Sequence, residues 1–402
     1  MKNDELILKA SPLPSKTWNF LKINDTDIPV PKKIKSENEC SVKCLPENIK
    51  LLRTDANEAL KIFKGEKISG ALGENVEKWL SEQNLKCMFF TVEASKSGRD
   101  LENSDAEKRG GKANGLTGLN AAGAAPARPG GKDILPAHIT IELKAEEKHA
   151  SLFVIHAKKG TNSRFIFECR QNTNFSNTGE GFLAVFVLCC LEENSALEIS
   201  KIQFLGQKTA YLSDIGALAK RDSKLTLIRG NFGAEKSWLG SKTSLKGDGA
   251  EIESKLAYMT DDSQTLDIND IGIHYGKRTV SGFNSQGVML GKSYKNYKGT
   301  IDFIKGCSSS SGEEKEDVLL LSDDIINKST PVILCDEEDV TGNHGATLGK
   351  IDENLLFYMG SRGLDGQSAK RLIANGKLYN IINRIPSKEL IEKTVSHIDT
   401  AF

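Results

Sequence analysis

About half of this chain, from residue 134 to residue 335, consists of short apolar or alternating segments separated by turns of Gly, Asp, Asn and Ser. The stretch shows almost none of the spacing of an amphipathic helix, whereas alternation of apolar and polar residues is typical of strands. So many short strands exclude an alternating α/β fold and leave a sandwich, a barrel, a propeller or a β-solenoid. The clearest predicted strands are residues 138–144, 151–157, 164–168, 184–191, 197–205 and 225–228.

The turns between these strands help to choose among the four architectures. Folds built from hairpins favour Asn-Gly or Asp-Gly pairs. Such pairs do not dominate here, and Gly247-Asp248-Gly249 is the clearest exception. No strict repeat of fixed length is visible. We therefore expect a mainly β fold whose strands form stacked coils, a β-solenoid, over residues 133–350.

Residues 1–94 are predicted to form an N-terminal helical region. Val76, Trp79 and Leu80 stand three and four positions apart, which predicts a helix that lays one face on another part of the fold. Residues 95–132 are instead rich in Gly, Ala, Ser, Asn, Lys and Arg. Because such a segment cannot bury enough apolar area to offset the entropy of ordering it, we expect a flexible, low-complexity insert.

Helical patterns return in residues 351–402, the predicted C-terminal helical region. Ser387 follows Pro386 and precedes Glu389, which indicates an N-cap and an acidic first turn of the last helix. This region is expected either to cover the end of the β domain or to dock a partner.

The charge balance argues against several classes of function. The chain has 54 Lys+Arg and 54 Asp+Glu among 402 residues, so its formal net charge is zero. Recruitment of nucleic acid or of an anionic membrane by bulk electrostatics needs an excess of basic residues. The longest apolar run, residues 182–191, is about half of a bilayer span, and residues 1–10 contain no signal-peptide core. We expect a cytoplasmic protein that binds no nucleic acid and does not insert into a membrane.

The eight cysteines form no paired C-x-x-C set, so they predict no self-contained zinc or ferredoxin-type site. Any bound metal is therefore expected to be shared or transient. Cys189 and Cys190 are adjacent in a predicted strand, so their side chains should point to opposite faces. Cys335 follows an apolar strand and is predicted to be buried. Cys307 precedes four serines and is predicted to lie in an exposed turn, where it would be the more reactive thiol.

An ordered series of motifs lies near the end of the β region: GTIDFIKG (299–306), LLLSD (319–323), VTGNHGAT (340–347), GKID (349–352) and LFYMGSRG (356–363). This series resembles the SufB/SufD family. These proteins are the scaffold subunits of the SUF iron–sulfur cluster assembly system. Weaker similarity runs back towards Trp18 and covers most of the chain outside the insert.

The resemblance implies a fold, partners and a cargo. The fold is a right-handed parallel β-helix between N-terminal and C-terminal helical regions. The function is that of a non-catalytic subunit that pairs with SufB in a heterodimer and binds the SufC ATPase through its C-terminal helical region. A nascent cluster would form near the interface of the two subunits, so iron or an iron–sulfur cluster would be shared with SufB. The resemblance also implies indirect contact with a cysteine desulfurase and allows a reduced flavin in the complex.

Two positions favour SufD over SufB within this family. SufB-like proteins carry a functional cysteine at the position that matches Ile325, and they tend to read His-Glu-Ala where this chain has His344-Gly345-Ala346. One departure concerns SufD itself, because many SufD sequences have a cysteine where this chain has Gly342. The resemblance therefore does not by itself imply a cluster ligand or a sulfur carrier at that position.

His344 is the candidate ligand of iron or of a transient cluster. A neutral imidazole binds iron through one ring nitrogen and needs no deprotonation near neutral pH. The alternative is a histidine that only shapes a turn. The acidic run from Asp336 to Asp339 could attract iron but is more typical of a solvated turn. By resemblance, Arg362 and Leu364 are the candidate residues for docking SufC.

Three alternatives stay open on the sequence alone. The chain could be a SufB-like paralogue that acts as the cluster scaffold itself. It could be a polysaccharide-active β-helix enzyme, since solenoids often present acidic residues along one face, although no paired-carboxylate motif stands out. It could also be a purely structural solenoid, in which case His344 would have no role in cluster maturation.

Overall fold

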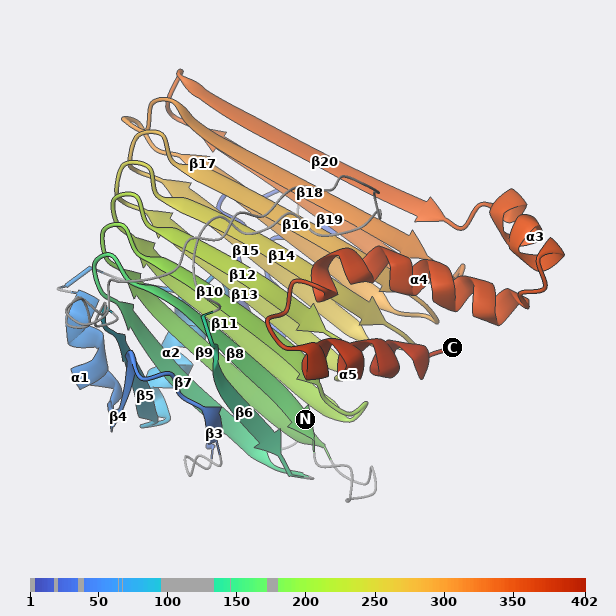
Figure 1. The fold of residues 1–402 in the computed structure, drawn as a ribbon, viewed down its shortest axis with the longest axis horizontal. Helices are drawn as coiled ribbons and strands as arrows, with labels where there is room; N and C mark the ends of the chain where they lie inside the picture. The colour runs from blue at the N-terminus through green and yellow to red at the C-terminus, as the bar shows by residue number, and fades with distance from the viewer. Residues whose placement is uncertain are drawn as a thin grey trace, which may run out of the picture.

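A computed structural model describes residues 4–17, 21–34, 40–63, 65–66, 68–94, 134–144, 146–171 and 180–402. The chain is a mainly β protein built around a β-solenoid of about seven turns, with helices towards both ends (Figure 1). This architecture confirms the predicted fold class. The insert predicted over residues 95–132 lies outside the described residues.

Two sheets of nine strands form the solenoid. Sheet I contains β3 (Cys40–Cys44), β6 (Ala137–Leu143), β8 (Asn162–Gln171), β10 (Ala196–Phe204), β12 (Lys224–Asn231), β14 (Glu251–Thr260), β16 (Val280–Met289), β18 (Ser310–Leu320) and β20 (Val340–Lys350). Sheet II contains β4 (Ile49–Asp55), β5 (Lys86–Val92), β7 (Lys148–Ala157), β9 (Gly181–Leu191), β11 (Thr209–Ala219), β13 (Lys236–Leu245), β15 (Thr265–His274), β17 (Tyr294–Phe303) and β19 (Ile326–Cys335).

From β6 onward, consecutive strands alternate between the two sheets, and every pair of neighbours within a sheet is parallel. Only β3 with β6 and β4 with β5 pair antiparallel within these sheets. Residues that are paired between parallel strands point to the same side of the sheet, and successive residues of a strand point to opposite sides. Each sheet therefore has one set of side chains that faces the solenoid interior and one that faces outward.

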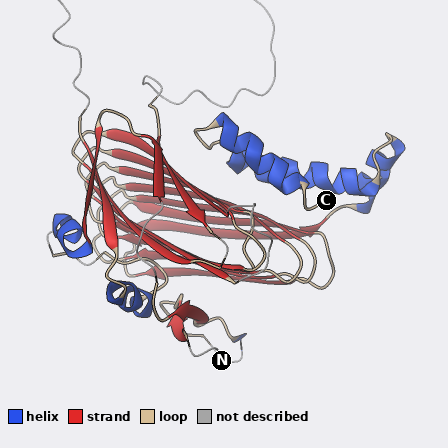
Figure 2. Cartoon of the chain, turned by 90° about the horizontal axis from the view of Figure 1, so that it is seen from below, coloured by secondary structure: helices blue, strands red, loops and turns tan. Residues whose placement is uncertain are grey.

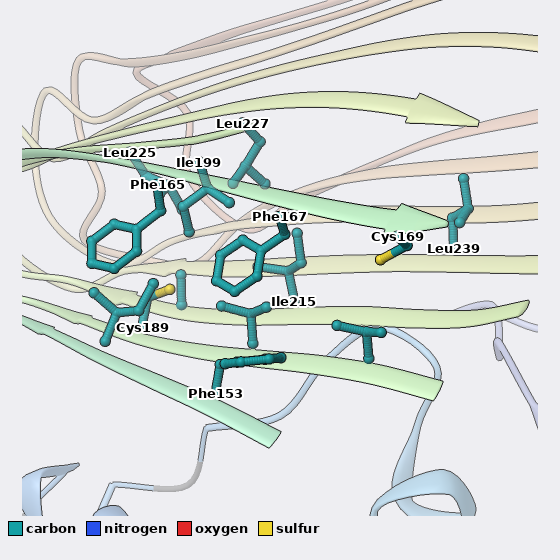
Figure 3. Packing of buried hydrophobic residues seen from close by; sticks show 14 of the residues in the cluster. Phe153, Phe165, Phe167, Cys169, Cys189, Ile199, Ile215, Leu225, Leu227 and Leu239 are labelled. Atoms are coloured by element: carbon teal, nitrogen blue, oxygen red, sulfur yellow. The ribbon is translucent and has the colours of Figure 1, made fainter. Parts of the chain in front are cut away.

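The first coils have an apolar interior. Phe153, Phe165 and Phe167 are fully buried there, and the rings of Phe153 and Phe167 lie 4.9 Å apart in an edge-to-face arrangement (Figure 3). Cys189 belongs to this interior cluster, whereas Cys190 packs in the cluster on the outer face of sheet II. The prediction that the two adjacent cysteines face opposite sides is therefore confirmed.

The outer faces of the two sheets are covered by opposite ends of the chain (Figure 2). On sheet II lie α1 (Ala56–Leu60), the 3-10 turn η2 (Lys61–Phe63) and α2 (Glu74–Glu82), whose buried Trp79 contacts Phe182. On sheet I lie α4 (Gly366–Ile382), packed over β12, β14 and β16, and α5 (Lys388–Asp399). Between β20 and α4, α3 (Glu353–Ser361) extends beyond the strand ends (Figure 1).

The predicted helices agree with the structure at both ends of the chain. Ser387 caps α5 by accepting a hydrogen bond from the backbone N–H of Leu390. The N-terminal region also contains strands that the sequence did not indicate: β3 to β5 extend the solenoid, and β1 (Glu5–Ala10) pairs with β2 (Thr26–Pro31) in a separate hairpin. Among the described residues, no helix is long and apolar enough to cross a membrane.

Removing one ring from the interior should destabilise the chain strongly. Phe167→Ala leaves a cavity among fully buried neighbours, so the free energy of unfolding should fall by about 3–5 kcal/mol. Leu52→Ala is the matched control, because Leu52 is 58% exposed on β4 and its loss should cost no more than about 0.5 kcal/mol. Urea unfolding midpoints measure both effects. Equal midpoints for the two variants would contradict the assigned interior.

Candidate functional site at the open end of the solenoid

The last coil, formed by β19 and β20, is paired on one side only. β19 bonds to β17 and β20 bonds to β18, and each is the terminal strand of its sheet. Every residue of β20 is exposed or half-buried, whereas β18 beneath it carries buried residues. An edge strand presents unpaired N–H and C=O groups that can bond to another strand. Both sheets therefore end in an edge that is open for pairing.

His344 lies in the middle of β20 and is exposed. It stands in register with Glu314 of β18. Glu314 and Glu316 are buried in the interior row of β18, whereas the intervening Lys315 is exposed. Because paired residues of parallel strands share a face, His344 continues the interior row. It stands at the open end of the solenoid interior, here called the mouth of the solenoid. The structure thus places the predicted ligand on an accessible surface and beside interior carboxyl groups.

The carboxyl group of Glu314, one strand below His344, has an unusually high pKa. Burial, with smaller contributions from the carboxylates of Asp270 and Glu316, raises the pKa of Glu314 to about 8, and Lys295 only partly opposes this shift. Space for the carboxyl group comes from Gly299 on the opposite sheet, since a Cβ atom there would lie 2.2 Å from the carboxyl carbon of Glu314. A carboxyl group with this pKa is mostly protonated at pH 7.

Charged pairs join apolar side chains in the interior of the last coils. Lys295 and Glu316 form an ion pair in which both side chains are fully buried. Deeper in the stack, Arg229 of β12 donates a hydrogen bond to Asp270 of β15 at 2.5 Å. Several buried polar atoms near these pairs have no hydrogen-bond partner among the described residues; they include Oε2 of Glu314, Oε2 of Glu316 and the hydroxyl groups of Tyr258 and Tyr297. Buried polar groups are normally satisfied, so such a cluster is typical of a functional site.

The structure reverses both predictions made for the cysteines beside this site. Cys307, predicted to be exposed, is fully buried against Phe283, Ile301 and Phe303, because the turn that carries it folds back over the interior. Cys335, predicted to be buried, is exposed, because it ends β19 and no further coil covers that strand. Its thiol donates a hydrogen bond to the backbone carbonyl of Glu337 at 3.0 Å. Cys335 is therefore the accessible thiol at the open end.

The acidic run between β19 and β20 forms the turn itself. The carboxylate of Glu337 accepts a hydrogen bond from the backbone N–H of Gly306 at 2.8 Å, and the carboxylate of Asp339 accepts one from the hydroxyl of Ser309 at 2.8 Å. These contacts tie the turn to the coil below. They support the interpretation of this run as a solvated turn.

The second predicted surface lies on α3 and the segment that follows it. Arg362 ends α3 and its guanidinium stacks 5.2 Å from the ring of Tyr358, and Leu364 is 36% exposed. The same helix exposes 80% of Phe357 and 55% of Tyr358. Sequence reasoning missed these two aromatic residues as a surface feature, although both belong to the motif that carried the resemblance. Exposed aromatic groups of this kind mark interaction sites.

The open end does not hold a complete set of metal ligands by itself. Within the described ranges, the one group of three His, Cys, Asp or Glu ligand atoms close enough to hold an ion consists of His156, Cys190 and Glu192, far from β20. His344 can supply one nitrogen ligand, and the exposed thiol of Cys335 lies on the same coil. A metal bound at this end therefore needs ligands from a second chain or from small molecules.

Comparison with known proteins identifies a domain that covers most of the solenoid. The family model described as SUF system FeS cluster assembly, SufBD core domain, matches residues 141–377, which is more than half of the chain. The matched part begins in β6 and ends within α4, so it includes the open end and α3.

Individual relatives agree with this match. The chain is 30% identical over 191 residues to the iron–sulfur cluster assembly protein SufD of Bacillus subtilis, covering 48% of this chain and 44% of the relative. It is 24% identical over 241 residues to a SufBD family protein of Synechocystis, covering 58% and 50%, and 28% identical over 176 residues to one of Mycobacterium tuberculosis, covering 44% and 21%. The chain thus spans half or less of the length of these relatives.

The raised pKa of Glu314 predicts a pH dependence of stability. The folded chain holds a proton on this carboxyl group up to about pH 8, whereas the unfolded chain releases it near pH 4.5. Stability attributable to the protonated group is therefore present below pH 4.5 and is lost as the pH rises through 8. Between pH 5 and pH 9, the free energy of unfolding of the wild type should fall relative to that of Glu314→Gln by up to a few kcal/mol.

Denaturant titrations at several pH values measure this difference. Glu313→Gln is the control, because Glu313 is the exposed neighbour on the same strand and should leave the pH profile unchanged. Parallel pH profiles for the wild type and Glu314→Gln would show that Glu314 is ionised at neutral pH.

Proposed function

Because this chain belongs to the SufB/SufD family of the SUF iron–sulfur cluster assembly system, we propose that it is the SufD-like scaffold subunit of an assembly complex. In this role it catalyses no reaction alone and supports the acquisition of iron and the building of a nascent cluster. The observation that carries the proposal is the open end of the solenoid, where two edge strands and the exposed His344 coincide. Ile325 favours SufD over SufB, because it occupies the position of the functional SufB cysteine.

The proposed partner at the open end is a SufB subunit. A second solenoid of the same family can place its own edge strands against β19 and β20, so that both sheets continue across the interface. Exposed apolar side chains on these strands favour such contact: Ile326 of β19 is 54% exposed and Leu348 of β20 is 52% exposed. Pairing would bury these side chains and satisfy the free backbone groups of both chains.

The proposed cargo at this interface is iron or a nascent iron–sulfur cluster. His344 would provide one nitrogen ligand from this chain, and SufB would provide the others. The interior carboxyl groups beneath His344 would bias the mouth of the solenoid towards cations when they ionise. A site completed by two chains suits a transient cluster, because separation of the chains removes ligands and releases it.

The proposed partner of α3 is the SufC ATPase. Phe357 and Tyr358 of α3 and the following Arg362 and Leu364, together here called the α3 surface, include two exposed rings and a guanidinium that stacks on Tyr358. Aromatic residues and arginine dominate the energetics of protein interfaces. Because α3 lies between β20 and α4, a movement of bound SufC could be transmitted to the edge strand that carries His344.

Substitution of His344 should uncouple cluster assembly from complex formation. After co-expression with SufB and SufC and anaerobic purification, His344→Ala should still copurify with both partners but should contain roughly tenfold less iron and acid-labile sulfide per complex. Asn343→Ala is the control, because Asn343 lies on the same strand in the opposite row. Wild-type levels of iron and sulfide in His344→Ala would refute the ligand role. Cluster formation with SufC but without SufB would instead favour a SufB-like role.

Disruption of the α3 surface should remove SufC selectively. Phe357→Asp places a charge at the most exposed aromatic residue of this surface, and the amount of SufC that copurifies should fall at least tenfold while SufB is retained. Leu52→Asp places the same charge on an exposed apolar residue of the opposite sheet and should leave both partners bound. Retention of SufC by Phe357→Asp would mean that SufC binds elsewhere.

A further inference from the structure

A group of three potential metal ligands lies on the outer face of sheet II, away from the open end. His156 ends its row on β7 and stands in register with Cys190 of β9, and Glu192 follows β9 directly. One nitrogen, one sulfur and one oxygen atom of these side chains all lie within 4.8 Å of one another. Cys190 is 1% exposed, whereas His156 and Glu192 are half-buried.

The spacing of these atoms is close to that of a coordination shell. Nε2 of His156 and Oε1 of Glu192 are 3.2 Å apart. Ligands on a tetrahedral ion with metal–nitrogen and metal–oxygen bonds of about 2.0–2.2 Å lie roughly 3.3–3.6 Å apart, and a sulfur ligand lies slightly further away. Small rotations of the side chains would bring all three atoms onto one ion. A fourth position would remain for water.

The chemistry of the set selects the class of metal. A thiolate with an imidazole and one carboxylate suits Zn²⁺, Fe²⁺ or Co²⁺, whereas Mg²⁺ and Ca²⁺ prefer oxygen ligands alone. Burial opposes ionisation of Glu192, but hydrogen bonds from Lys220 and His156 outweigh it and hold the pKa of this carboxyl group below its usual range. The carboxylate is therefore ready to accept a cation.

Lys220 occupies the place of that cation. Its ammonium group donates hydrogen bonds to both oxygens of Glu192, each at 3.0 Å. The side chain of Lys220 is 30% exposed, so it can turn to solvent without leaving a buried charge. Glu66 also acts electrostatically on the ammonium group of Lys220. An ion that enters the cluster would take over the charge pairing that Lys220 now provides.

We propose that His156, Cys190 and Glu192 bind one divalent ion of the zinc class, and that the ion displaces the ammonium group of Lys220. On binding, the thiol of Cys190 releases its proton to solvent and no electron is transferred. The site is separate from the open end, because β9 and β19 are five strand spacings apart in sheet II, roughly 24 Å. It requires no second chain, so it stands independently of the proposed function.

Cobalt titration of the full chain, purified without a polyhistidine tag and treated with chelator, tests this site. Co²⁺ should bind with one-to-one stoichiometry and produce a thiolate charge-transfer band in the near ultraviolet with visible bands of a four-coordinate ion. Cys190→Ser should abolish the charge-transfer band. Cys189→Ser is the matched control, because its side chain lies on the other face of the same strand, and it should keep the band.

Two further variants test the remaining contacts. His156→Gln should weaken Co²⁺ binding at least roughly tenfold. Lys220→Met should strengthen it, because the competing ammonium group is removed while the stem of the side chain is kept. Persistence of the charge-transfer band in Cys190→Ser would overturn the proposal, as would the absence of the band in both the wild type and Lys220→Met. The second comparison does not depend on the folding of Cys190→Ser.

Discussion

Parallel pairing in register is the interaction on which the rest of this structure depends. Each strand from β8 to β18 bonds to one neighbour on each side, so the side chains of paired residues form continuous rows along the whole stack. The same rule leaves β19 and β20 with an unpaired edge, because no further coil follows them. The order within the stack and the open edges at its end thus follow from the same pairing pattern.

The interior rows change character along the stack. Phenylalanines dominate the interior of the first coils, whereas the last coils combine apolar side chains such as Phe283 and Phe303 with the buried ion pair of Lys295 and Glu316. Buried ion pairs contribute little net stability, because desolvation of both charges offsets their attraction. The apolar clusters therefore supply most of the stability, whereas the buried pair of Lys295 and Glu316 lies in the coils next to His344.

Local patterns predicted a large part of the fold. Alternation located the strands, the cap at Ser387 located α5, and parity placed Cys189 and Cys190 on opposite faces. No fixed repeat was visible, because from β6 onward the distance between paired residues varies from 26 residues (Ala210 to Lys236) to 34 (Asn162 to Ala196) as the turns change length. Exposure of Cys335 and burial of Cys307 depend on which coil is last, and no local pattern contains that information.

The position of α4 limits how the length of this molecule can change. Duplication or loss of a complete coil keeps every other side chain on its own face of the sheet, so solenoids of this type can lengthen or shorten by one coil at a time. α4 packs across β12, β14 and β16 on the outer face of sheet I and so bridges these three coils. A coil inserted beneath α4 would disrupt the packing of α4 against sheet I. A coil inserted among the earlier strands would leave this packing unchanged.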